Sequence, residues 1–134
     1  MADRPTHLAE LLGIEILDPG PDPARAQLEV TPAVCQPFGI VHGGTLASLA
    51  ETLCSVATYE AVKDDGMLAL GQSNDTTFLR PISAGVVHAE ARPRHRGRTS
   101  WVWDAEISDD AGRVCCLVRM TVAIRPPPSG ARSG

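Results

Sequence analysis

The chain has 134 residues, the size of one domain with one hydrophobic core. Hydrophobic residues make up 43% of it and charged residues 21%, as in a globular protein and unlike a disordered chain. The net charge of −4 argues against general nucleic-acid binding. The longest apolar stretch, 38–57, is interrupted by His42 and Glu51, so it does not predict a transmembrane helix. We expect no nucleic-acid partner and no membrane association.

The N-terminal residues and the four cysteines suggest a compartment, and the C-terminal residues set the end of the domain. Residues 1–7 lack a basic region followed by an apolar one, so we expect no secretory signal and a cytoplasmic location. The cysteines show no C-x-x-C spacing, and we expect free buried thiols, with adjacent Cys115 and Cys116 facing opposite sides of a strand. Residues 126–134 lack apolar side chains and are expected to be disordered, which leaves 1–125 as a single domain.

The first half of the chain predicts one strand and one long helix. Residues 8–14 form a short apolar segment, and the prolines of 19–23 force a turn. Strict alternation of apolar and polar residues over 24–30 predicts a half-buried strand. Two prolines and a glycine make 31–40 a connecting loop. From 45 to 62 the apolar period changes to that of an amphipathic helix.

The predicted helix has two distinct stripes. The apolar one consists of Leu46, Leu49, Ala50, Leu53, Cys54 and Ala57. The second contains small or hydroxylic residues around a single carboxylate: Gly44, Ser48, Glu51 and Ser55. Gly66 is suited to the left-handed conformation just past a helix end.

The second half returns to strands, which are separated by turn-forming residues. The predicted strands are 68–79, 86–94, 100–107 and 114–124, arranged as a meander. Because the helix is too apolar to lie exposed, we expect an α+β fold in which an antiparallel sheet wraps around it. An open edge strand would remain, and it favours a homodimer.

His42-Gly43-Gly44 stands directly before the predicted helix. The first N–H groups of a helix lack partners and carry the positive end of its dipole, so they can stabilise a developing oxyanion. Glycine lets a ligand approach this backbone closely. The alternative is that the two glycines only allow tight packing.

Glu51 lies about two turns into the most apolar helix, where an unpaired carboxylate is costly. It is either a catalytic carboxylate or a solvent-facing glutamate. Ser55, one turn later, can hydrogen-bond it or a nearby water. Gln36 offers an amide from a proline-bounded loop, although such a residue is often only solvated.

Four arginines surround His95: Arg92, Arg94, Arg96 and Arg98. They predict either a contact with a phosphate-bearing ligand or a solvated edge strand and loop. Trp101 and Trp103 share one strand face and are expected to be core or interface anchors.

Several motifs together resemble the hotdog-fold thioesterases. The first is residues 36–44, Gln-Pro-Phe-Gly-Ile-Val-His-Gly-Gly, followed by Leu49-Ala50-Glu51-Thr52 and Ser55-Val56-Ala57. The others are 74–81, 95–98 and 110–116. Within this family the chain is most similar to the branch that contains 4-hydroxybenzoyl-CoA thioesterase with a helix glutamate and the enterobacterial 1,4-dihydroxy-2-naphthoyl-CoA hydrolase.

The resemblance implies a sheet wrapped around the helix, active sites at a dimer interface, and a tetramer built from two dimers. It implies that Glu51 is nucleophile or general base and that the Gly43 N–H binds the oxyanion. Gln36 and His42 would orient the thioester, and Ser55 would position the water or the carboxylate. It also implies substrate contacts from Gly71 and, from the partner subunit, from Phe78, Leu79, Arg80, Pro81, His95, Arg96, Gly97, Arg98, Thr99 and Ser100. This favours the phosphate interpretation of the arginines.

The expected function is hydrolysis of an aromatic or medium-chain acyl-CoA to free acid and CoA, without a metal or a redox cofactor. Attack by Glu51 would give a mixed anhydride, whereas base catalysis would activate water directly. Two alternatives are a hotdog hydratase or dehydratase acting on thioesters and a non-catalytic acyl-CoA-binding module.

Overall fold

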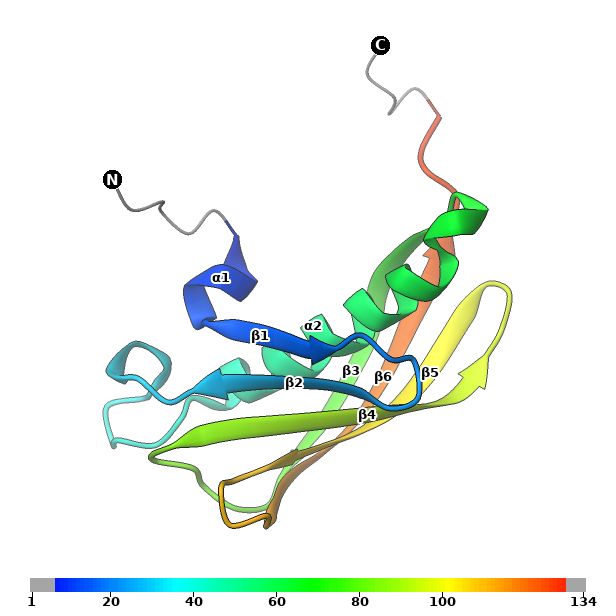
Figure 1. Ribbon diagram of the computed structural model, residues 1–134. Helices are drawn as coiled ribbons and strands as arrows, with labels where there is room; N and C mark the ends of the chain where they lie inside the picture. The colour runs from blue at the N-terminus through cyan, green and yellow to red at the C-terminus, as the bar shows by residue number, and fades with distance from the viewer. Residues whose placement is uncertain (1–6, 130–134) are drawn as a thin grey trace.

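The structure is a computed structural model that describes residues 7–129. One antiparallel sheet of six strands curves around a 20-residue helix, α2 (Figure 1). The elements are α1 (Leu8–Leu12), β1 (Ile14–Asp18), β2 (Ala24–Glu29), α2 (Gly43–Val62), β3 (Leu68–Phe78), β4 (Val86–Arg96), β5 (Ser100–Ser108) and β6 (Val114–Arg125), with short 3-10 helices at Pro32–Val34 and Lys63–Asp65. This arrangement confirms the α+β hotdog fold expected from the sequence.

The strand order is β1-β2-β4-β5-β6-β3, so β3 pairs with β6 and not with the strand that follows it in sequence. The predicted four-strand meander is therefore wrong, since only β4, β5 and β6 pair consecutively. The connection 79–85 carries the chain from the sheet edge to its middle, and Val41 N–H and Leu79 N–H hold it by bonding to Ile82 O and Cys115 O, both at 2.7 Å. Alternation identifies a strand, but its partner depends on long-range packing.

Helix α2 fills the concave side of the sheet (Figure 1). Its predicted apolar stripe is confirmed, because every member is buried: Leu46, Leu49, Ala50, Leu53, Cys54 and Ala57. Opposite it, alanines pair across β2 and β4, Ala24 with Ala91 and Ala26 with Ala89, and all four are buried. These small side chains leave space for the helix to lie close to the strands. Each fully buried leucine contributes about 1.5–3 kcal/mol relative to an exposed one.

The helix begins at Gly43, two residues earlier than the apolar period indicates, because the side chain of His42 caps it. It ends at Val62, followed by a 3-10 turn and then Gly66, whose φ of 74° is the left-handed conformation predicted there. Trp101 and Trp103 lie on one face of β5 and are both buried, with ring centroids 5.8 Å apart. They are core residues of the chain.

The N-terminal segment holds an additional short helix and strand that apolar periodicity did not predict. α1 has five residues, too few for a periodic signal, and Gly13 turns the chain into β1 with a φ of 78°. β1 pairs with β2 and forms one edge of the sheet, while β3 forms the other. The sheet therefore has six strands where five were expected.

The cysteines are free thiols, as the sequence predicted. All four cysteines are free; Cys54, Cys115 and Cys116 are buried, whereas Cys35 is half-buried. Residues 126–128 form no helix or strand, and the rest of the predicted disordered tail, 130–134, lies outside the described residues. Within residues 7–129 no helix is both long and apolar enough to span a membrane.

Candidate active site

The imidazole of His42 caps the N-terminus of α2. Its Nδ1 accepts a hydrogen bond of 2.9 Å from Gly44 N–H, and Thr45 N–H bonds to His42 O. Because Nδ1 is an acceptor, the neutral ring carries its proton on Nε2, which is left as a donor. Gly43 N–H bonds to no other group among residues 7–129 and lies at the positive end of a 20-residue helix. This is the donor that the sequence predicted for an oxyanion.

Gly43 cannot be replaced by a larger residue without moving its neighbour. A Cβ built at this position would lie 3.0 Å from Cζ of Phe78. The aromatic ring at the end of β3 therefore packs directly on the helix start, within the same chain. This is the close approach for which glycine is required.

A pocket of about 380 Å³ opens beside this helix start. It brings together six of the predicted site residues, all from one chain, although the resemblance implied that residues 78–81 contact the substrate from the partner subunit. Its lining consists of Gln36, Ile40, Val41, Gly43, Leu46, Phe78, Leu79, Arg80, Pro81 and Ile82. Most of these side chains are apolar, and Gln36 and Arg80 supply the polar groups, a composition typical of small-molecule sites.

The loop that carries Gln36 is tied to the helix start. Gln36 N–H bonds to Ile40 O at 2.8 Å, and Gly39 closes the turn with a φ of 85°. His42 N–H bonds to Val34 O at 2.9 Å. These bonds place the half-buried Gln36 beside Gly43, as its position in the sequence predicted.

Glu51 lies two turns further along α2, facing β3, and its side chain is solvent-accessible in the single chain. Its Oε1 accepts a hydrogen bond of 3.2 Å from Asn74 Nδ2, and its Oε2 lies beside Gly71, where a Cβ would be only 3.1 Å away. Glu51 is thus exposed in the single chain, and Asn74 holds one of its carboxylate oxygens. Ser55 is half-buried one turn later and makes no hydrogen bond to Glu51 within the described residues.

Asn74 and Thr76 had no role in the prediction from sequence. Asn74 Nδ2 also donates to Ala47 O at 3.0 Å, and Thr76 Oγ1 donates to Asn74 Oδ1 at 2.6 Å. Both residues face α2 from β3. Asn74 falls inside a motif that carries the family resemblance, and this was the signal that could have identified it.

Glu51 and the Gly43 pocket are separate in one chain. Eight helical residues at 1.5 Å each place the two backbone positions about 12 Å apart. Glu51 is accordingly not among the residues that line the pocket.

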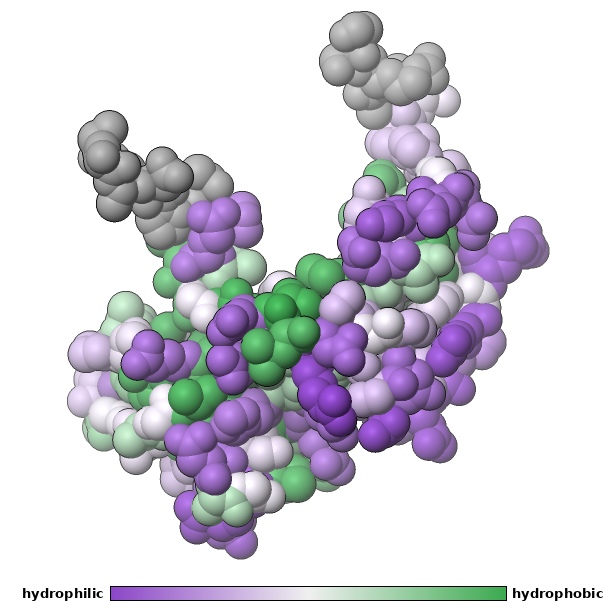
Figure 2. Space-filling view, in the orientation of Figure 1, coloured by the Kyte–Doolittle hydropathy of each residue, from purple (hydrophilic) through white to green (hydrophobic). Residues whose placement is uncertain are grey.

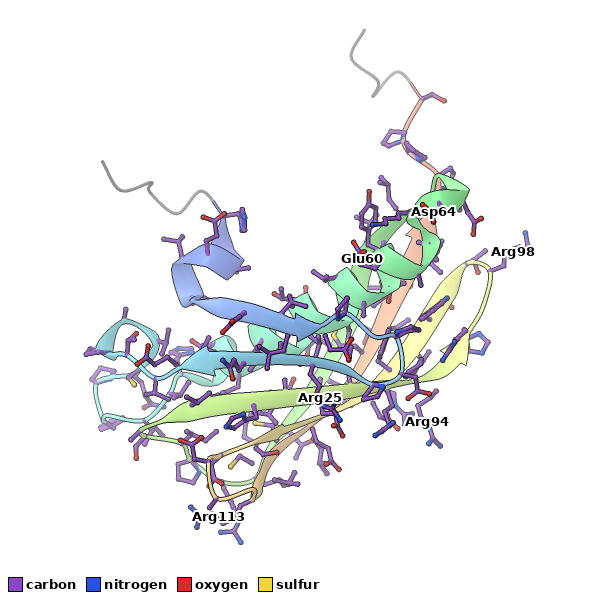
Figure 3. The ribbon with its side chains drawn as sticks, viewed as in Figure 1. Arg25, Glu60, Asp64, Arg94, Arg98 and Arg113 are labelled. Carbon is purple, nitrogen blue, oxygen red and sulfur yellow. The ribbon has the colours of Figure 1, made fainter. Side chains whose placement is uncertain are left out.

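The predicted phosphate-binding loop, 95–100, lies at the opposite end of α2 from Gly43 (Figure 3). It borders a second hollow of about 390 Å³ between the end of α2 and the β4–β5 hairpin, to which Gly97 and Arg98 contribute. The hairpin is closed by Gly97 N–H, which bonds to Ser100 O at 2.8 Å, and Thr99 O accepts from Ile124 N–H. One chain therefore does not bring this loop to Gly43.

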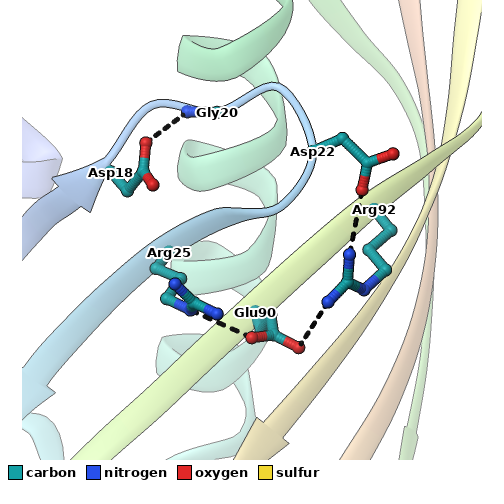
Figure 4. Close-up of polar contacts among 6 residues, drawn as sticks. All are labelled: Asp18, Gly20, Asp22, Arg25, Glu90 and Arg92. Atoms are coloured by element: carbon teal, nitrogen blue, oxygen red, sulfur yellow. Dashed lines mark hydrogen bonds and ion pairs between the residues drawn. The ribbon is translucent and has the colours of Figure 1, made fainter.

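Three of the four arginines near His95 pair with carboxylates of the same chain. Arg92 bonds to Asp22 at 3.0 Å and lies 3.7 Å from Glu90, which also accepts from Arg25 (Figure 4). Arg94 pairs with Asp104, and Arg96 pairs with Asp22 and lies 5.5 Å over the ring of Trp101.

Arg98 stands at the tip of the hairpin and points away from the sheet (Figure 3). It takes part in none of the ion pairs among the described residues. Figure 2 shows hydrophilic side chains along this end of the molecule and hydrophobic ones near its centre. The arginines thus divide into three with internal partners and one available to a ligand.

The cysteines are poor candidates for a nucleophile. Burial, and to a smaller extent the Glu51 charge, raise the pKa of Cys54, and burial raises the pKa of Cys116 to about 11. Both thiols are therefore protonated at neutral pH, whereas the thiolate is the nucleophilic form. Within residues 7–129, His, Cys, Asp and Glu side chains form no group of three or more that could hold a metal ion.

Comparisons with known proteins agree with this geometry. The family model for the thioesterase superfamily matches residues 38–116. The chain is 40% identical to the proofreading thioesterase EntH of Cronobacter turicensis over 117 residues, which are 87% of this chain and 85% of that protein.

Solved structures give the same result. A thioesterase of Haemophilus influenzae superposes with a TM-score of 0.85 at 33% identity, covering 92% of this chain and 86% of that one. A thioesterase of Staphylococcus aureus superposes with a TM-score of 0.86 at 32% identity, covering 90% and 100%.

A hotdog fold with these relatives defines a thioester hydrolase. The chain belongs to the thioesterase superfamily. The hydratase and the non-catalytic binding module considered from the sequence find no support among these relatives.

Proposed function

We propose that the chain hydrolyses an aromatic or medium-chain acyl-CoA, with Glu51 of one subunit acting on a thioester bound at Gly43 of another. The observation that carries this proposal is the separation of about 12 Å between the two positions on one helix. A catalytic carboxylate and an oxyanion donor must both lie about 3 Å from the reacting groups. One chain does not meet this requirement, so we propose that two copies meet it together.

The free edge of β3 supports such a pairing of copies. β3 has 11 residues, none of them buried, and its outer edge is unpaired within the described chain. Long open edges are templates for strand pairing. The midpoint between Gly43 and Glu51 is Ala47, whose carbonyl bonds to Asn74 near the middle of β3. A two-fold axis through the middle of β3 would place α2 of a second copy antiparallel to this helix, with its Glu51 on the side of Gly43.

A relative supports the pairing of Gln36 with Glu51 in one function. The Staphylococcus aureus protein has been crystallised with alanine in place of a glutamine and with alanine in place of a glutamate. These two positions are 15 residues apart in that chain, and Gln36 and Glu51 are also 15 residues apart here. We propose that both act at the thioester.

The proposed binding mode uses the two hollows. The acyl group would occupy the mainly apolar pocket beside Phe78, and its carbonyl oxygen would accept from Gly43 N–H, with Gln36 and His42 Nε2–H orienting the thioester. Leu79, Arg80 and Pro81 would contact the pantetheine. In the assembled protein, Arg98 and the rest of the 95–100 loop would meet the CoA phosphates. We propose a dimer as the minimal active unit and a tetramer of two such dimers.

Two routes lead to the same products. In the first, Glu51 attacks the carbonyl carbon, CoA thiolate leaves and takes up a proton, and water hydrolyses the mixed anhydride to restore Glu51. In the second, Glu51 removes a proton from a water positioned by Ser55, and this water attacks the carbonyl carbon directly. Neither route requires a metal or a redox cofactor. Because all four cysteines are free, we also propose a reducing compartment such as the cytoplasm.

A subunit-mixing assay tests the shared site. Glu51→Gln and Gln36→Ala are each expected to be nearly inactive in a thiol-release assay with benzoyl-, hydroxybenzoyl-, naphthoyl- and straight-chain CoA thioesters. When the two variants are unfolded together and refolded as mixed dimers, half of the sites in each heterodimer are intact, so about a quarter of wild-type activity should return. No recovery, with heterodimers present, would contradict the shared site. Full activity of Glu51→Gln would contradict the role of Glu51.

The two routes are separated by a single turnover in ¹⁸O-labelled water. When water attacks the Glu51 carbonyl of the mixed anhydride, one labelled oxygen enters Glu51 and the released acid carries an unlabelled oxygen that came from Glu51. Direct attack by water leaves Glu51 unlabelled.

A further inference from the structure

We propose that Asn74, oriented by Thr76, is a positioning residue that anchors Oε1 of Glu51 and leaves Oε2 as the reacting oxygen. This inference rests on the proposed function, because it assigns a task to a residue that acts through Glu51. It adds to the site two polar residues of β3, a strand for which the family resemblance implied only substrate contacts.

The orientation of the Asn74 amide follows from its neighbours. One end of the amide faces two groups that only accept hydrogen bonds, the Glu51 carboxylate at 3.2 Å and Ala47 O at 3.0 Å. The NH₂ must therefore point to them, and Oδ1 must point to Thr76. The Thr76 hydroxyl then donates to Oδ1 at 2.6 Å, which holds the oxygen end of the amide in place.

The two oxygens of Glu51 consequently have different surroundings. Oε1 is held by Asn74, whereas Oε2 accepts no hydrogen bond from the described residues and lies against Gly71. A glutamate side chain has several rotatable bonds, and an exposed one samples many rotamers. The bond from Asn74 restricts this sampling and holds the free oxygen beside Gly71.

A β-bulge in β3 creates this arrangement. Gly71 pairs with Val122 and Ser73 with Thr121, so Gln72 is an extra residue on β3. Before the bulge the odd positions face α2, as Gly71 does. After it the even positions face α2, so that Asn74 and Thr76 approach the helix.

The odd positions after the bulge face the opposite way. Asp75 and Thr77 line a hollow on the outer face of the sheet with Asp104 and Arg119. With continuous pairing after Gly71, Ser73 would take the place of Asn74 opposite Met120 and Asp75 the place of Thr76 opposite Val118, so no amide would reach Glu51. The bulge thus determines which side chains of β3 face Glu51.

The test uses Thr76→Val and its matched control Thr77→Val, together with Asn74→Leu. We expect Asn74→Leu and Thr76→Val to lower kcat by about tenfold or more while KM changes less than about twofold, since misplacing a catalytic group reduces turnover. Thr76→Ser, which keeps the hydroxyl, should restore wild-type kcat, and Thr77→Val should not change it. The substrate is the acyl-CoA of the panel that the wild-type enzyme hydrolyses fastest.

A double-mutant cycle distinguishes positioning from a structural role. In a Glu51→Asp background the shortened carboxylate no longer reaches Asn74, so Asn74→Leu should cause little further loss of kcat. Losses that multiply in the double variant, or an unchanged kcat in Asn74→Leu while Glu51→Gln is inactive, would overturn this inference and leave the proposed function intact. Activity retained by Glu51→Gln would instead overturn the proposed function.

Discussion

The indole Nε1–H of Trp103 donates a hydrogen bond of 2.9 Å to Oγ1 of Thr58, and both residues are fully buried between β5 and α2. The Thr58 hydroxyl in turn donates to Cys54 O at 2.7 Å. These two hydrogen bonds satisfy the one polar atom of the Trp103 side chain and fix the helix against the sheet. It joins the two layers at a point where an unpaired donor would have no access to water.

Thr58→Val should therefore destabilise the protein. The substitution preserves the shape of the side chain but leaves the Trp103 N–H without an acceptor, which costs about 1–3 kcal/mol. Urea unfolding followed by tryptophan fluorescence measures the change in the free energy of unfolding. Thr52→Val on the same helix is the control, because Thr52 is half-buried and its hydroxyl has no partner among residues 7–129. Equal stability of the two variants would contradict the importance of the Trp103 bond.

Gly43→Ala should reduce kcat/KM by about tenfold or more, because the new methyl group would lie 3.0 Å from the Phe78 ring and displace it or the helix start. The double variant Gly43→Ala/Phe78→Leu, in which a smaller side chain makes room, should recover part of the loss. The thiol-release assay measures both. Wild-type activity in the single variant would show that the contact with Phe78 does not determine the position of the oxyanion donor.

Two variants of His42 should separate its cap from its proposed contact with the thioester. Asparagine is a good N-cap and can replace the acceptor Nδ1, whereas alanine cannot, so His42→Ala should lose about 0.5–2 kcal/mol of stability and His42→Asn much less. Both lack Nε2–H and should have reduced kcat/KM. Thermal melting and the thiol-release assay provide the two measurements. Full activity of His42→Asn would mean that the imidazole serves only as the cap.

The turn between β5 and β6 should make stability depend on acidic pH. The hydrogen bond from His88, followed by that from Val86 N–H, lowers the pKa of Asp110 from its usual 3.8. A carboxylate with a lowered pKa stabilises the folded state above the unfolded-state pKa, and this contribution disappears as pH falls through the folded-state pKa.

As the pH falls from 5 to below about 3.8, the free energy of unfolding should therefore decrease more in wild-type protein than in Asp110→Asn. Urea unfolding at several pH values in this window measures the difference. His88→Gln is the companion variant, since it removes the main cause of the lowered Asp110 pKa while keeping the carboxylate. Identical pH slopes in wild type and Asp110→Asn would contradict this account of the turn.

Local patterns were sufficient for most elements. The apolar stripe from Leu46 to Ala57 identified α2 because a 3.6-residue period is a property of the chain itself. Alternation identified β2, and turn-forming residues delimited β3, β4, β5 and β6. The short α1 and β1 were missed because five residues carry too little periodicity. The site was predicted in part: His42, Gly43 and Glu51 lie where the helix pattern placed them.

What the sequence determined by itself was the helix, the glycines at its start and the carboxylate eight residues later, since these depend on near neighbours along the chain. The tertiary structure alone decided that β3 pairs with β6, that Phe78 packs on Gly43 and that Asn74 reaches Glu51. The last of these depends on one extra residue, Gln72, which reverses the faces of β3. Alternation along a sequence shows no such reversal, because a bulge exists only relative to the strand that pairs with it.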